Sequence, residues 1–137
     1  MVALLPKVMR LMAKRHSNEL LKGKISLPQF IVLDFLYKEK RAIMSKIAEI
    51  LSVSAPAATG IVNKLVRDGY LIREYDSKNR RIILIRLTNK GRDLIKKIIE
   101  QRRSLVKDIF GKLSEKERHD YLHILTKIYK LLLENHR

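Results

Sequence analysis

The change of hydrophobic spacing at Gly69 constrains the fold of this chain more than any other feature. Before it, apolar residues recur at helical spacing through A55-P-A-A-T-G-I-V-N-K-L-V-R-D-G69. After it, two runs rich in β-branched and aliphatic residues, Y70-L-I-R-E-Y75 and I82-I-L-I-R-L87, flank the charged stretch D76-S-K-N-R-R81. Such runs predict two strands joined as a hairpin with a charged tip. The sequence therefore predicts a mainly α fold with one small β-hairpin.

Two short helices are predicted immediately before this hairpin. The first covers A42-I-M-S-K-I-A-E-I-L51, and the break S52-V-S54 separates it from the second. Ser54 is a natural N-cap, since its hydroxyl can accept a hydrogen bond from a free N–H of the first turn. Gly69 is a natural C-terminal stop. Two short helices joined by three or four residues are typical of a helix-turn-helix.

Longer helices are predicted on both sides of this segment. Residues 2–22 have apolar residues at helical spacing, and the helix is expected to end near Gly23. A second helix begins around Leu27–Pro28 and is apolar on more than one side, which predicts a central, buried position. Thr88 is expected to cap a long helix. Ser114 and Glu117 form a capping box that opens the last helix.

Composition limits the function. The 137 residues carry a net charge of +16, spread over the whole chain, and such basicity favours a polyanionic partner, usually nucleic acid. There is no cysteine, which excludes disulfides, thiolate metal sites and thiol redox sensing. No apolar run approaches the roughly 18 residues needed to span a bilayer. The opening M1-V-A-L-L-P-K-V-M-R-L-M-A-K-R-H16 has too short an apolar stretch for a secretory signal, so we expect a cytoplasmic protein.

The second short helix has two different faces. At 100° per residue, Ala58, Ile61, Val62 and Leu65 share the side that faces the core. The other side is small at its N-terminal end and then amide-bearing or basic. Small residues let a helix backbone approach the floor of the major groove. We therefore expect DNA contacts along this helix and its cap from Ser54, Pro56, Ala57, Thr59, Gly60, Asn63, Lys64 and Arg67.

These side chains have different expected roles. Ala57 can contact a thymine methyl, Asn63 can read adenine edges, and Lys64 can bind guanine or phosphate. Thr59, at the edge of the face, can bind a phosphate oxygen or a base. The alternative is a plain solvated helix face, which explains the charges but not the exposed run of Pro, Ala and Gly. The basic hairpin tip adds Lys78, Arg80 and Arg81, and arginines at such a tip can enter the narrow minor groove.

The order helix, helix, helix-turn-helix, charged wing and two long helices resembles the MarR family of winged-helix transcription regulators. The family pattern at the wing is D-x-R, five residues, L-T, two residues, G. Here it is met by N79-R-R81, residues 82–86, L87-T88 and G91. The helix-turn-helix pattern of the family is met by I47-A48, V53-S54, Thr59, Leu65 and Gly69. The resemblance covers almost the whole chain.

The resemblance implies a single MarR-type domain over 1–137, with a winged helix-turn-helix lobe at 27–90. The segments 1–22 and 91–137 would form the dimerisation helices of a homodimer. It also implies that the second helix of the motif lies in the major groove and that Arg81 enters the minor groove. The family commonly has an acid at position 79 that pins this arginine. Asn79 stands there instead, so we expect amide hydrogen bonds to hold Arg81, in a wing that is more mobile without DNA.

A two-fold dimer implies double-stranded DNA with a pseudo-palindromic site, whose half-site centres lie about one helical turn apart. Repression is favoured over activation, because a dimer that covers promoter DNA blocks polymerase without further contacts. The family often responds to small organic ligands, and an effector stays open here. No cofactor is expected.

Other functions receive less support. A non-specific basic architectural protein would explain the diffuse charge, but the chain lacks an unstructured basic tail and has few aromatic residues for stacking on single strands. The sequence has neither a glycine-rich phosphate loop nor a pattern that would pair a nucleophile with a base, so nothing in it favours an enzyme. His119 and His123 are four residues apart on the last predicted helix and could share a metal, although such pairs commonly occur by chance.

Overall fold

The computed structural model describes residues 1–19 and 24–135, with side chains for all of these except 16–19. It has two compact units, Met1–Gln101 and Arg102–Arg137, and each is described by itself. The first unit opens with α1 (Leu4–Glu19), which falls inside the helix predicted over 2–22. The predicted end of that helix near Gly23 lies outside the described residues. Apart from half-buried Met12, the side chains of residues 1–15 are exposed.

The centre of the first unit is α2 (Leu27–Glu39). Its start confirms the prediction at Leu27–Pro28. The helix also has a capping box, in which the backbone N–H of Gln29 donates to Ser26 Oγ and the N–H of Ser26 donates to Gln29 Oε1. Phe30, Val32, Leu33 and Leu36 are at most 4% exposed. The central, buried position expected of this helix is therefore confirmed.

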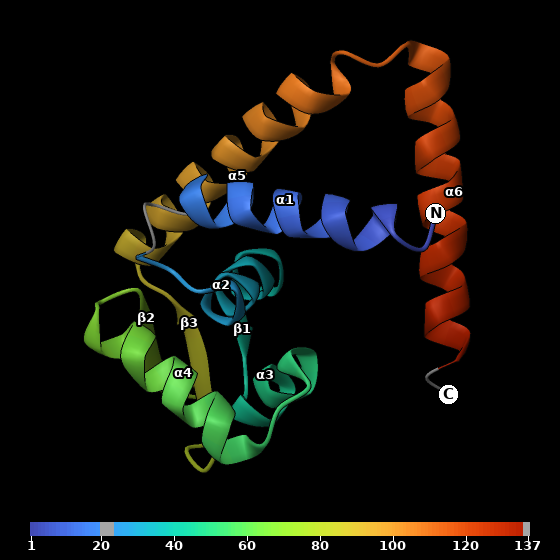
Figure 1. Cartoon of the computed structure of the whole chain (residues 1–137). Helices are drawn as coiled ribbons and strands as arrows, with labels where there is room; N and C mark the ends of the chain where they lie inside the picture. Colours follow the sequence, from blue (N-terminus) through green and yellow to red (C-terminus); the bar gives the residue numbers. More distant parts are fainter. Residues whose placement is uncertain (20–23, 136–137) are drawn as a thin grey trace. The chain divides into compact units, whose positions relative to one another are not determined.

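The predicted helix-turn-helix is formed by α3 (Met44–Leu51) and α4 (Ala55–Arg67), which pack against each other and against α2 (Figure 1). Ser52 has a left-handed backbone, with φ of 53°, and it ends α3. Ser54 then caps α4 as predicted, since its Oγ accepts from the N–H of Ala57 at 3.3 Å. The turn between the helices thus depends on two serines, Ser52 through its backbone conformation and Ser54 through its side chain.

The sheet has one strand more than the predicted hairpin. Strands β2 (Leu71–Tyr75) and β3 (Ile83–Leu87) pair antiparallel as expected, and β1 (Arg41–Ala42) pairs with the other edge of β3. The strand order is therefore β1-β3-β2. This corrects the predicted start of the first short helix at Ala42, because the backbone of that residue belongs to the sheet and the helix begins at Met44.

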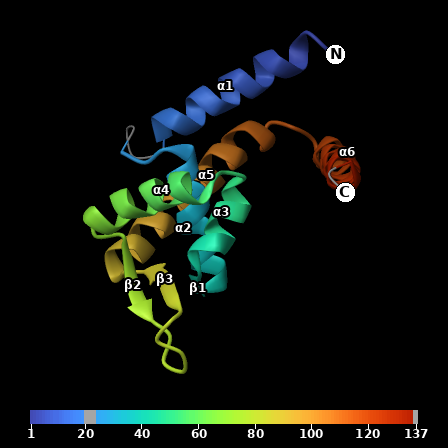
Figure 2. The ribbon, with the colours of Figure 1, turned by 90° about the horizontal axis from the view of Figure 1, so that it is seen from below.

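Alternate residues of the hairpin face the core. Leu71, Ile85 and Leu87 are at most 4% exposed, and they join the apolar side chains of α2, α3, α4 and α5 in one cluster. The tip, residues 76–82, projects beyond the helices of this lobe (Figure 2). The core thus holds the base of the hairpin, while the charged tip is exposed.

The junction between β3 and α5 (Asn89–Phe110) explains the L87-T88-x-x-G91 motif. The Thr88 hydroxyl donates to the Gly69 carbonyl at 2.6 Å and accepts from the Gly91 N–H at 3.1 Å. A Cβ on Gly91 would lie 2.1 Å from the Tyr70 carbonyl oxygen, so only glycine allows this approach. Thr88 therefore caps α5, as predicted, and also ties the start of α5 to the turn that follows α4.

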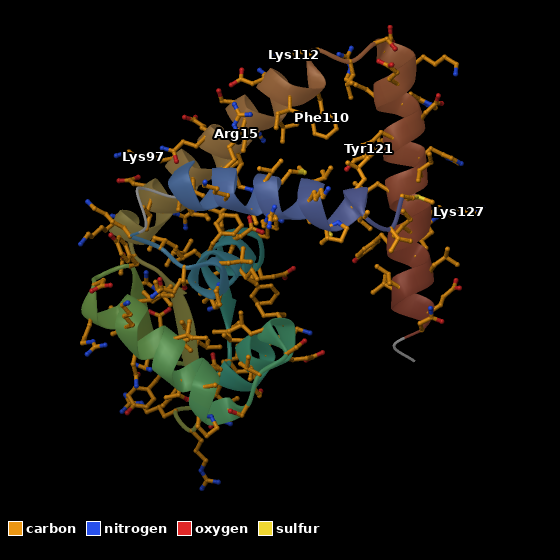
Figure 3. All side chains as sticks on the ribbon, in the orientation of Figure 1. Arg15, Lys97, Phe110, Lys112, Tyr121 and Lys127 are labelled. Atoms are coloured by element: carbon orange, nitrogen blue, oxygen red, sulfur yellow. The ribbon has the colours of Figure 1, made fainter. Side chains whose placement is uncertain are left out.

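The second unit holds the end of α5 and α6 (Glu115–Glu134). The predicted capping box is present, with Ser114 and Glu117 bonding each other's backbone N–H. The rings of Phe110 and Tyr121 lie 5.2 Å apart between centroids (Figure 3). Arg118 donates to the carbonyl of Phe110, the last residue of α5, and to that of Leu113 in the loop before α6. No helix in the described part of the chain is long and apolar enough to cross a membrane.

Candidate nucleic-acid interface

The two faces of α4 are confirmed. Ala58, Val62 and Leu65 are fully buried, and Ile61 is half-buried. The opposite face is exposed and consists of Pro56, Ala57, Gly60, Asn63, Lys64 and Arg67. The helix thus presents a stretch without long side chains in its first half and polar or cationic side chains in its second half.

Gly60 lies in the middle of this exposed face. A Cβ built on it meets no atom within 4 Å, so packing inside the protein does not require glycine here. Its backbone is also helical, so no unusual φ requires it. A helix-interior glycine costs about 1 kcal/mol relative to alanine. Neither the packing nor the backbone geometry of this chain offsets that cost.

Two hydroxyls at the start of α4 have opposite hydrogen-bonding states. Ser54 Oγ accepts from the Ala57 N–H, so its own hydrogen is available to an outside acceptor. Thr59 is half-buried, and its hydroxyl donates to the Ala55 carbonyl at 2.9 Å. Thr59 can therefore accept a hydrogen bond from outside, whereas the expected bond to a phosphate oxygen would require it to give up Ala55.

Asn63 is exposed and is bonded to a residue that the sequence did not single out. Its side-chain Oδ1 accepts a hydrogen bond from the guanidinium of Arg73 in β2. The contact joins the polar half of the α4 face to the base of the wing, since α4 packs on β2. Strand alternation places Arg73 on the same face of β2 as Leu71, and this alternation is the sequence feature from which the position of Arg73 could have been predicted.

The basic side chains of the wing tip, Lys78, Arg80 and Arg81, are all exposed. Within residues 1–19 and 24–135, no salt bridge involves them or the two cations of the α4 face. By contrast, Arg86 on β3 pairs with Glu74 at 2.9 Å. The cations of the wing tip and of α4 are thus available to an outside anion, whereas one at the base of the wing is neutralised.

Asn79 acts on the backbone of the tip. Its Oδ1 accepts from the backbone N–H of Arg81 at 3.1 Å, and its carbonyl accepts from the N–H of Ile82 at 3.0 Å. The N–H of Asp76 donates to the Ile82 carbonyl and closes the loop. We expected amide hydrogen bonds to hold Arg81. They do so through its main chain, and in the described part of the protein no hydrogen bond engages its guanidinium.

No metal centre is formed by the described residues. His119 and His123 both lie on α6 with exposed side chains, and no group of three or more His, Asp or Glu that could hold a metal occurs in that part of the chain.

The helix-turn-helix, the small and exposed face of its second helix and the basic wing define a winged helix-turn-helix protein. The family model "MarR family" matches residues 25–83, which include α2, α3, α4 and β2. The structure resembles a solved MarR family protein from Bacillus stearothermophilus, with 25% identity and a TM-score of 0.82 over 96% of this chain and 95% of that one. The chain is therefore similar to MarR family proteins in sequence over residues 25–83 and in fold over most of its length.

Two further comparisons bear on function. The chain is 27% identical over 107 residues to the HTH-type transcriptional repressor MdtR of Bacillus subtilis, covering 78% of this chain and 69% of that protein. It also shares its fold with FabT of Streptococcus pneumoniae, solved in complex with DNA. That likeness has a TM-score of 0.82 and 24% identity, over 96% of this chain and 94% of that one.

Proposed function

We propose that this chain is a homodimeric, sequence-specific repressor of transcription, in which α4 lies in the major groove and the wing reaches the flanking minor groove. The observation that carries this proposal is the open face of α4 around Gly60, where an added Cβ meets no atom. A glycine that costs helix stability and relieves no internal crowding is explained when an outside surface must approach the helix backbone. The floor of the major groove is such a surface.

The polar groups around this open face suit a duplex. Ser54 has a free hydroxyl hydrogen for a phosphate at the N-terminus of α4, where the helix dipole also favours an anion. Ala57 contacts a thymine methyl, and Thr59 accepts from a base amino group. Lys64 and Arg67, toward the other end, bind phosphate or guanine. These contacts fix the helix in the groove and read part of its sequence.

The wing supplies a second, mainly electrostatic contact. Lys78, Arg80 and Arg81 are exposed and without an acidic partner in the described residues, so their charge is available to phosphates. The guanidinium of Arg81 enters the minor groove, where the negative potential is strongest. Asn79 shapes the turn through the backbone and leaves that guanidinium free to move into the groove.

The dimer is supported by apolar side chains that are exposed within each unit. On α1 they include Leu4, Leu5 and Leu11, each 58% exposed or more, and on α6 they include Leu122, Ile124 and Leu132, each at least 56% exposed. Water contact with so much apolar surface is costly, and pairing with a second copy removes it. A two-fold dimer also matches two half-sites about one helical turn apart.

Repression follows from occupancy of promoter DNA, and the relation to the repressor MdtR supports it. The relation in fold to FabT, solved with DNA, supports the duplex as partner. A regulator of this kind acts where the chromosomal DNA is, so we assign it to the cytoplasm. Release by a small ligand, which the family resemblance implies, stays a prediction.

Selection of bound DNA from random duplexes tests the proposal. We expect enrichment of one short pseudo-palindrome whose half-site centres lie about 10 base pairs apart. A non-specific architectural protein would instead enrich no sequence, and that result would overturn the assignment.

A further inference from the structure

The hydrogen bond between Asn63 and Arg73 constrains which base Asn63 can recognise. The two residues belong to different elements, α4 and β2, and they meet because α4 packs on the hairpin. Asn63 lies on the exposed face of α4, whereas Arg73 is half-buried beside it. A base-reading side chain is thus held by a neighbour at the base of the wing.

The chemistry of the pair fixes the orientation of the amide. A guanidinium carries only hydrogen-bond donors, so the Asn63 atom that faces it must be the carbonyl oxygen. The amide nitrogen, with two donors, then lies on the other side of the planar group. No hydrogen bond from this nitrogen occurs among the described residues. Asn63 therefore offers donors to a ligand, and its acceptor is turned toward β2.

Adenine and guanine make opposite demands on such a group. An asparagine reads adenine bidentately by accepting from the N6 amino group and donating to N7. Guanine presents acceptors at both N7 and O6. A side chain that offers donors is therefore matched to guanine. At adenine, the N6 amino group is itself a donor and would face the donors of the Asn63 amide without forming a hydrogen bond.

We propose that Arg73 is a positioning residue that holds Asn63 in its donor orientation, so that Asn63 selects guanine rather than adenine at the base pair it meets. This inference rests on the proposed major-groove role of α4. It replaces the expectation from sequence that Asn63 reads adenine. Arg73 need not contact a base itself, because it acts through the orientation of its partner.

Base preference at each position of the selected site tests this inference. The variant Arg73→Met keeps an unbranched apolar stem but removes the guanidinium and every donor. We expect it to lower the guanine-to-adenine affinity ratio at one base pair per half-site by about tenfold, the scale of one bidentate contact. The other positions should keep their preferences. Arg73→Lys, which retains a donor, should restore much of the ratio.

A second set of variants separates positioning from a general effect on the fold. In the Asn63→Ala background, Arg73→Met should leave the guanine-to-adenine ratio unchanged, because the group it positions is absent. Lys64→Ala is the matched control, since it removes a neighbouring exposed side chain for which the described residues show no hydrogen bond or ion pair with Arg73, and the effect of Arg73→Met should persist in it. Circular dichroism melts confirm that each variant is folded. If Arg73→Met fails to fold, the guanine-to-adenine affinity ratios of the wild type, Arg73→Lys and Asn63→Ala are compared instead, and these ratios decide whether Asn63 selects guanine.

The outcomes are distinguishable. If the wild type enriches no sequence, the proposed function fails. A second outcome is that the wild type enriches a site at which Asn63 proves to select adenine, so that Asn63→Ala removes a preference for adenine. A third is that Arg73→Met leaves the guanine preference of the wild type intact. Either result overturns only the role of Arg73. Persistence of the Arg73→Met effect without the Asn63 amide would likewise contradict it.

Discussion

Substitution of Gly60 separates what the fold needs from what DNA binding needs. An added Cβ at this position meets no atom within 4 Å, and the backbone is an ordinary helix. Glycine inside a helix is about 0.8–1.0 kcal/mol less favourable than alanine. Gly60→Ala should therefore stabilise the protein by roughly 1 kcal/mol, which corresponds to a rise in Tm of about 4 °C for a chain of this size.

DNA binding should change in the opposite direction. If the α4 backbone near Gly60 touches the floor of the groove, a methyl group reduces that contact and a longer side chain prevents it. Gly60→Gln adds a good helix former without charge, so it leaves the count of phosphate contacts unchanged. We expect it to weaken binding of the selected duplex at least tenfold, about 1.4 kcal/mol, with a smaller loss for Gly60→Ala.

Fluorescence anisotropy with the selected duplex, together with thermal melts, measures both effects on the same samples. Ser104→Gln is the matched control, because Ser104 is an exposed helical residue of α5 and is not one of the α4 residues expected to contact DNA. It should leave the affinity unchanged. If Gly60→Gln is at least as stable as the wild type and binds the duplex equally well, α4 does not enter the groove through this face.

Three other perturbations test separate parts of the account. Gly91→Ala places a methyl 2.1 Å from the Tyr70 carbonyl oxygen, so urea denaturation should show a loss of about 2–3 kcal/mol, and a loss below about 0.5 kcal/mol would mean that this junction is not tight. Arg81→Ala should weaken binding of the selected duplex and lower its salt slope by about 1 while the dimer stays folded, and an unchanged affinity would rule out the minor-groove role. Deletion of residues 1–19 removes the exposed apolar side chains of α1, so sedimentation at several concentrations should show a weaker dimer, whereas unchanged association would assign the interface to other helices.

Features fixed by local interactions were predicted from the sequence. Ser54, Thr88 and Ser114 each cap the helix that follows, since a cap depends on hydrogen bonds to residues three positions away. The faces of α4 were also predicted, because a period of 3.6 residues determines which side chains share a side. The strands on both sides of residues 76–82 were located to within one residue, because runs of β-branched and aliphatic residues favour strands.

Features fixed by tertiary packing were missed. Strand β1 has two residues, too few to show alternation, and its partner Arg86 lies far along the chain from Arg41. The bond between Asn63 and Arg73 depends on how α4 lies on β2, which spacing alone does not specify. Asn79 was expected to hold Arg81 by amide hydrogen bonds. It does so through the backbone N–H of Arg81, because a short amide side chain in a turn reaches the N–H two residues ahead more easily than a guanidinium.

The roles of the wing and of the α4 face share one requirement, which is that this protein distinguishes one DNA sequence from others. The most direct test is the ratio of its affinity for the selected duplex to its affinity for a shuffled duplex of the same composition, measured at physiological salt. We predict a ratio of about a thousand or more. Equal affinity for the two duplexes would show that the +16 charge alone drives binding, and it would contradict the assignment as a sequence-specific regulator.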